Sequence, residues 1–91
     1  GGPPDLVITN KYQPSLPNYA FEIEVTNQGH TTAQMAQINF DLFQDGKQVE
    51  SSSLQMDYIP VNSKKVGWLV FVTEKKSNDS LVVSSMTFLE P

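Results

Sequence analysis

Apolar and polar residues alternate along two segments of the chain with the period of two that is typical of β-strands. In residues 19–26 every odd position is apolar, and Glu22 and Glu24 lie on the opposite phase. In residues 36–43 the even positions are apolar, and most of the odd positions are polar. We therefore predict two strands that each have one face in a core and one face in solvent.

Shorter apolar segments, separated by turns that contain glycine, proline or asparagine, predict the remaining strands. Asp45 and Gly46 predict a tight hairpin turn, because both residue types tolerate positive φ angles. The serines of residues 51–53 predict a polar break in the chain that returns from this turn, and Pro60 ends the next strand. The segments with a strand-like pattern are residues 6–8, 19–26, 36–43, 48–50, 54–59, 66–72 and 81–89.

These segments predict an all-β fold, because turn signals recur every 8–12 residues or so and no segment has helical periodicity. The expected architecture is an immunoglobulin-like two-sheet antiparallel sandwich of about seven strands. A chain of 91 residues corresponds to a single domain. We assign residues 5–91 to this domain, and residues 1–4 to an extended lead-in or an artificial remnant.

The last third of the chain is apolar on both phases, in residues 66–72 and again in residues 81–89. Such strands are buried on both sides, or their second side meets another molecule. Trp68 and Phe71 are three residues apart, so they face opposite sides of a strand. We predict a partner surface here, with Trp68, Leu69, Phe71 and Phe88 as candidates, about half of which face the core. Alternatively, the loop at residues 10–18 covers this patch.

Composition and charge exclude several classes of function. Ten acidic residues against six lysines give a net charge of −4, and arginine is absent. Nucleic-acid binding is not expected, because it needs clustered basic side chains that neutralise phosphates. Cysteine is absent, which removes disulfides and thiolate chemistry. No apolar run in these 91 residues has the length of about 18–20 residues that a membrane span needs, and we expect no signal peptide among them.

No catalytic, cofactor or metal site is predicted. His30 is the only histidine, and no second histidine or carboxylate follows it at metal-ligand spacing. Glu22 and Glu24 share one strand face, where solvated carboxylates are the default. An enzyme would require the fold to bring His30 together with a carboxylate and a serine, as a catalytic triad does. We predict a protein without enzymatic activity and without a cofactor.

Aromatic residues allow one further interpretation, a carbohydrate-binding module. Such a module predicts coplanar exposed rings on one sheet face or loop rim, with amide or carboxylate side chains beside them. Core filling is the competing interpretation, since a sandwich interior needs large side chains from both sheets. The rings concerned are those of Tyr12, Tyr19, Tyr58, Trp68, Phe71 and Phe88.

Two sets of motifs resemble known bacterial proteins. Residues 25–33 have the pattern V-x-N-x-G-x-x-x-A, and a strand and the Asp45-Gly46 turn follow it. This arrangement resembles cell-adhesion-related (CARDB-like) domains, which are immunoglobulin-like sandwiches. The second set joins residues 25–33 with DYIP at 57–60, SKK at 63–65 and LEP at 89–91. It is similar to a small bacterial family, in which Gly-Gly replaces the Gly67-Trp68 of this chain.

Members of that second family carry one N-terminal transmembrane helix before a domain of this length. Their genes lie beside a gene for an integral membrane protein with about seven predicted spans. The resemblance therefore implies an anchor that precedes this domain, and a location on the extracytoplasmic side of the bacterial inner membrane. We expect a non-enzymatic interaction domain that is accessory to an integral membrane protein, with membrane association only through the anchor.

Overall fold

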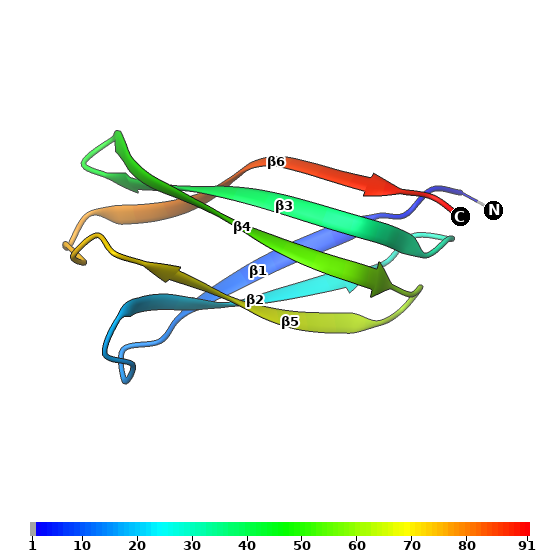
Figure 1. Ribbon diagram of the computed structural model, residues 1–91, viewed down its shortest axis with the longest axis horizontal. Coiled ribbons are helices and arrows are strands. Elements are labelled where there is room, and N and C mark those ends of the chain that lie inside the picture. Colours follow the sequence, from blue (N-terminus) through cyan, green and yellow to red (C-terminus); the bar gives the residue numbers. More distant parts are fainter. Residues whose placement is uncertain (1) are drawn as a thin grey trace.

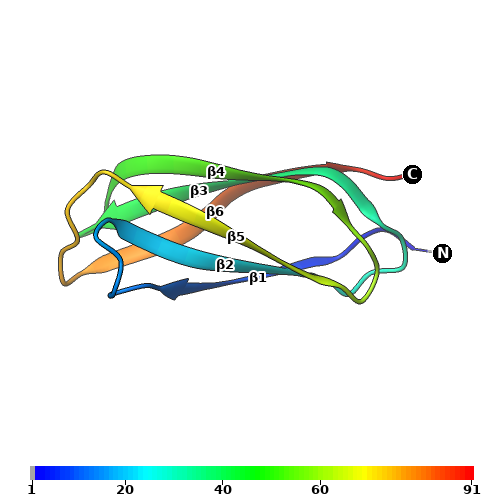
Figure 2. The same cartoon turned by 60° about the horizontal axis from the view of Figure 1, so that its bottom comes forward.

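The computed structural model describes residues 2–91, which form six β-strands and no helix. The strands are β1 (Leu6–Tyr12), β2 (Tyr19–Asn27), β3 (Ala33–Gln44), β4 (Lys47–Ile59), β5 (Lys64–Phe71) and β6 (Asp79–Leu89). They form two antiparallel sheets, with the orders β1-β2-β5 and β4-β3-β6, which face each other as two layers (Figures 1 and 2). The prediction of an all-β fold with two antiparallel sheets is confirmed.

The middle strand of each sheet supplies most of the core. Every odd residue of β2 is buried, and the buried residues of β3 from Ala36 onward lie at even positions. Both strands therefore follow the alternation seen in the sequence, with one face inward. The buried apolar residues that pack together are Leu6, Tyr19, Phe21, Ile23, Val25, Ala33, Ala36, Ile38, Phe40, Leu42, Ile59, Leu69 and Phe71.

The strand count corrects the sequence prediction, because the structure has six strands rather than about seven. The serines of residues 51–53 do not break the chain, and β4 runs through them from Lys47 to Ile59. Ser51 Oγ donates a hydrogen bond to Asp41 Oδ1 over 2.7 Å and accepts one from Gln48 Nε2 over 2.7 Å. Side-chain hydrogen bonds across the outer face thus hold a segment that lacks apolar residues in the sheet.

The Asp45-Gly46 turn forms as predicted. Gln44 pairs with Lys47, so only two residues connect β3 to β4. Asp45 has a φ angle of 50° and Gly46 one of 79°, the left-handed values that a two-residue hairpin turn of this type requires.

Asn27, at the end of β2, is fully buried and joins three segments of the chain. Its Oδ1 accepts hydrogen bonds from the backbone amides of Asp5 and Gly29, over 3.2 and 2.9 Å. Its Nδ2 donates to the carbonyl oxygens of Thr31 and Ile59, over 2.9 Å each. Asn27 therefore ties the N-terminal segment and the end of β4 to the connection between the two sheets.

Gly29 is required by a close approach of two segments rather than by an unusual backbone conformation. Its φ angle is not positive, and neither is that of Asn27, so a left-handed turn conformation is not the reason for either residue. A Cβ at Gly29 would lie 2.4 Å from the carbonyl oxygen of Pro3 and 2.5 Å from the amide nitrogen of Asp5. Part of the predicted lead-in thus packs against this connection, whereas Gly1 lies outside the described residues.

Candidate interaction surface

The two faces of β5 differ sharply in exposure. Leu69 and Phe71 point into the core and are 1% and 2% exposed, whereas Trp68 lies on the outer face and is 48% exposed. Trp68 and Phe71 therefore face opposite sides, as their spacing predicts. Since the other three candidates point inward or toward the core, Trp68 alone among them can contact a partner.

Three of the four residues predicted for the partner surface pack in or against the core instead. Leu69 and Phe71 belong to the buried core, because inward positions of β5 lie opposite the inward positions Phe21 and Tyr19 of β2. Phe88 on β6 is partly buried and packs against the same core. None of these three side chains contributes to an exposed surface on β5.

Val66 and Val70 complete the exposed face of β5, and each is 52% exposed. They lie two residues before and two residues after Trp68, so the pleat of the strand places all three on one side. We call Val66, Trp68 and Val70 the β5 surface. Sequence reasoning did not select the two valines, although their even positions match the phase of Trp68.

Acidic residues border the β5 surface on the neighbouring strand. In the β2–β5 register, Glu22 lies opposite Trp68 and Glu24 lies opposite Val66. Lys64 Nζ approaches Glu24 Oε2 at 3.6 Å, and solvent reaches both side chains, so this ion pair is weak. The surface is therefore an apolar row beside a row that carries two carboxylates.

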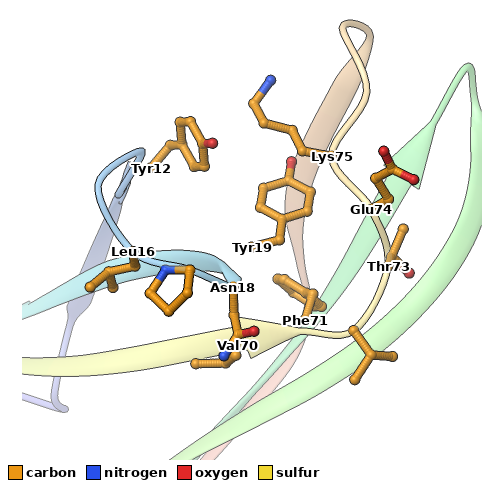
Figure 3. A pocket seen from close by; sticks show the side chains of 11 residues that line it. Tyr12, Leu16, Asn18, Tyr19, Val70, Phe71, Thr73, Glu74 and Lys75 are labelled. Carbon is orange, nitrogen blue, oxygen red and sulfur yellow. The ribbon is translucent and has the colours of Figure 1, made fainter.

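A cleft of about 490 Å³ continues this surface at one end of the sandwich. Figure 3 shows the lining side chains, which come from the β1–β2 loop and from the end of β5 with the residues that follow it. Val70 belongs to both the β5 surface and the cleft, and Leu16 and Val72 extend the apolar area with exposures of 43% and 94%. The lining residues are Tyr12, Leu16, Pro17, Asn18, Tyr19, Val70, Phe71, Val72, Thr73, Glu74 and Lys75.

Residues 10–18 do not cover the patch, which was the alternative left open by the sequence. Residues 10–12 of the predicted loop belong to β1, and only residues 13–18 form the loop. Its last part, with Leu16 and Pro17, forms a wall of the cleft beside Val70. Trp68 nevertheless keeps about half of its surface exposed, and so does Val66. The loop thus enlarges the apolar area instead of closing it.

Glu50 on β4 holds the end of β5 in place. Its carboxylate accepts hydrogen bonds from the amides of Val72 and Thr73 and from the Thr73 hydroxyl, at distances of 2.7 to 3.2 Å. Burial alone would raise the pKa of the Glu50 carboxyl, but the hydrogen bonds from Thr73 and Val72 lower it overall. The ionised carboxylate thereby fixes the backbone from which Val72 points outward.

The carboxylate of Asp79 holds neighbouring groups in place at the same end of the sandwich. Its Oδ2 accepts hydrogen bonds from the Tyr19 hydroxyl over 2.8 Å and from the amide of Lys76 over 3.0 Å. Burial by itself raises the pKa of the Asp79 carboxyl, whereas the hydrogen bonds from Lys76, Tyr19 and Gln44 lower it below its usual value. Burial and the bond to Asp79 raise the pKa of Tyr19 well above its usual value.

We expect Asp79 to make the fold sensitive to acid. Because its pKa is lower in the folded than in the unfolded state, the carboxylate stabilises the fold above the unfolded value, and this contribution is lost as the pH falls through the folded value. The free energy of unfolding, measured by urea titration, should therefore fall less between about pH 5 and pH 2 in Asp79→Asn than in the wild type. The matched control is Asp57→Asn, at an exposed position. A wild-type slope in Asp79→Asn would contradict the assignment.

Within the described residues 2–91, no hydrogen bond joins the ring of His30 to a carboxylate or a serine. His30 is exposed, and its backbone amide, rather than its ring, donates a hydrogen bond, to the carbonyl of Pro3 over 3.1 Å. Within residues 2–91, no group of three or more histidine, cysteine, aspartate or glutamate side chains is arranged to hold a metal ion. Glu22 and Glu24 are half-buried on the outer face of β2 and line no described cleft.

The aromatic residues pack mainly with one another. Tyr12 and Tyr19 meet edge to face at 88°, and Tyr19, Phe21 and Phe71 continue this cluster into the core. The most exposed rings, Trp68 and Tyr58, lie on different sheets, and the 37% exposed ring of Tyr12 packs against Tyr19 and Phe21. This geometry does not favour a sugar-stacking platform, which needs coplanar exposed rings.

Comparisons with protein-family models, with curated proteins and with solved structures each found no match. No helix in the described part of the chain is long and apolar enough to cross a membrane.

Proposed function

We propose that this domain is a non-enzymatic interaction module of the immunoglobulin-like class, which binds a protein partner through the β5 surface. The observation that carries the proposal is the row of Val66, Trp68 and Val70, each about half exposed on one strand face. Tryptophan is one of the side chains in which binding hot spots are enriched, and the two valines add apolar area beside it. The strand orders β1-β2-β5 and β4-β3-β6, with β3 and β5 both following a change of sheet, support the immunoglobulin-like assignment.

The partner that fits best is an integral membrane protein on the extracytoplasmic side of a bacterial inner membrane. Support for this setting comes from the family resemblance, in which an anchored domain accompanies a membrane protein of about seven spans. The β5 surface has the mixed character of a non-obligate interface, with apolar residues in one row and carboxylates in the next. We therefore propose a partner segment with an apolar centre and a basic flank facing Glu22 and Glu24.

Co-purification from detergent-solubilised membranes tests this function. The protein is captured together with the product of the neighbouring gene, and the double substitution Trp68→Ser with Val70→Ser is compared with the wild type. We expect the double variant to retain less than about a tenth of the partner, since loss of a central aromatic anchor costs 2 kcal/mol or more. Both side chains are half exposed, so the double substitution should lower the free energy of unfolding by about 1 kcal/mol or less.

Tyr58→Ser is the matched control, because Tyr58 is a 60% exposed aromatic residue on β4 of the other sheet. This variant should retain the partner at the wild-type level. Equal retention by all three proteins would exclude the β5 surface as the binding site. Binding to an envelope polysaccharide that Trp68→Ser alone abolishes, with the membrane protein still retained, would favour the carbohydrate-binding alternative.

A further inference from the structure

The sandwich is closed on one side and open on the other. On one side, β4 and β5 pack against each other across the two sheets, whereas β1 and β6 on the other side have no comparable contact. Figures 1 and 2 show β1 and β6 at the edges of their sheets. A cleft of about 310 Å³ lies between the end of β1 and the beginning of β6. Its aromatic and aliphatic lining residues are Tyr12, Tyr19, Phe21 and Leu81, and its polar and charged ones are Asn10, Lys75, Ser77, Asp79 and Ser80.

The four edge strands differ in their protection against pairing with another strand. Charged residues on an edge discourage strand addition, and an uncharged edge invites it. Lys11 lies on β1, Glu50 on β4 and Lys64 on β5, and Glu50 also occupies backbone amides at the end of β5. In contrast, β6 is charged only at its first residue, Asp79, whose carboxylate accepts hydrogen bonds from Tyr19 and from the Lys76 amide, and Ser80 to Leu89 carry no charge. Within residues 2–91, β6 pairs only with β3, so its other edge is free.

The inner face of β6 is also incompletely covered. Val83 lies opposite Phe40, which is buried, so Val83 belongs to the core-facing row. Despite this position, Val83 is 40% exposed, and Val82 on the outer face is 45% exposed. The pairing of β3 with β6 shifts between Asn39 and Phe40, which separates residues 79–83 from the rest of the strand. This first part of β6 borders the cleft.

We propose that residues 79–83 of β6 accept a seventh strand from another protein, an extended segment with apolar residues at alternate positions. The free backbone row favours a β-strand as the occupant. The part of the cleft lined by Tyr12, Phe21 and Leu81 favours apolar side chains on the inward face of that strand. Five residues match the usual length of a strand. The net charge of −4 favours a neutral or basic segment over an acidic one.

A second copy of this chain fits the site less well. In a pairing of β6 with β6, Leu81, Met86 and Phe88 of each copy would stay packed against their own core. They could not enter the cleft beside Tyr12 and Phe21 of the other copy. A strand that carries no core of its own can pair with β6 and fill the cleft at once. The edge of β6 lies away from Val66, Trp68 and Val70, so this inference does not rest on the proposed function, although Tyr12, Tyr19 and Lys75 line both clefts.

Titration of the isotope-labelled domain with a probe peptide tests the proposal. The probe has about eight residues, with valine alternating with threonine and a lysine at each end, and the control peptide has the same composition with its valines adjacent. We expect the amide signals of residues 79–83 to shift and their hydrogen exchange to slow with the alternating probe. The control peptide should bind about tenfold more weakly, because its valines cannot all face the cleft.

Two matched variants locate the site. Val82→Lys places a charge on the β6 edge and should weaken probe binding by about tenfold or more. Val49→Lys makes the same change at an exposed valine on β4 and should leave binding unchanged. Trp68→Ser should also bind the probe as the wild type does, which separates this site from the β5 surface. Shifts confined to β4 or β5, or no shifts at all, would overturn the proposal, and so would a dimer that already protects β6 before the probe is added.

Discussion

Asn27→Ala is expected to lower the free energy of unfolding by about 4 kcal/mol, because the lost side chain leaves several buried backbone groups without a partner. The wild-type amide accepts from the amides of Asp5 and Gly29 and donates to the carbonyls of Thr31 and Ile59. An alanine methyl group can replace none of these four bonds. Urea unfolding at neutral pH measures the loss, and failure to show a cooperative transition would be the extreme form of the same result.

Asn39→Ala is the matched control for this prediction. The Asn39 side chain lies on the outer face of β3 and donates to Ser85 Oγ over 2.7 Å in an exposed setting. Solvent can replace that bond, so this variant should lose no more than about 1 kcal/mol. Asn27→Asp adds a sharper comparison, since it keeps an acceptor for Gly29 but turns an oxygen toward the carbonyl of Ile59. Similar losses for Asn27→Ala and Asn39→Ala would show that the buried bonds are not important for stability.

Gly29→Ala is expected to cost about 2–3 kcal/mol through overpacking. The added methyl group would meet the Pro3 carbonyl oxygen at 2.4 Å and the Asp5 amide nitrogen at 2.5 Å. These are backbone atoms, so the N-terminal segment must move away as a whole instead of rotating a side chain. Hydrogen exchange should therefore accelerate at the amides of Gln28 and His30, which donate to Asp5 and Pro3 in the wild type.

Gly46→Ala separates this steric effect from the general effect of replacing a glycine. Gly46 has a φ angle of 79°, and no atom lies within 4 Å of an added Cβ. The substitution should therefore lower the free energy of unfolding by about 1 kcal/mol, through the backbone conformation alone. Exchange at Gln28 and His30 should be unchanged in this variant. A larger loss for Gly46→Ala than for Gly29→Ala would contradict the close approach between residues 3–5 and Gly29.

Sequence patterns were most informative where one residue and its immediate neighbours decide the conformation. Strict alternation in residues 19–26 and 36–43 predicted strands β2 and β3 and their buried faces, because a strand that turns one face inward has a period of two. Asp45 and Gly46 predicted the two-residue turn, because few residue types adopt its positive φ angles.

Patterns were less informative where distant segments decide the outcome. The serines of residues 51–53 predicted a break, but β4 continues through them. Ser51 donates a hydrogen bond to Asp41 on the neighbouring strand, which the local sequence does not show. The roles of Asn27 and Gly29 could not be seen in the local sequence, because only the position of residues 3–5 shows why a buried amide and a missing side chain are required there. For the candidate site, the spacing of Trp68 and Phe71 showed that they face opposite sides, without showing which one is outward.

The sequence by itself determined that this chain forms an all-β domain, and it pointed to the apolar strands rather than to His30 as the place to seek function. Local periodicity and turn chemistry are sufficient for those conclusions, because they depend on residues close together in the chain. Only the tertiary structure decided that Trp68, Val66 and Val70 face solvent while Leu69 and Phe71 fill the core. The reason is that a strand apolar on both phases has no preferred side until the other sheet packs against one of its faces.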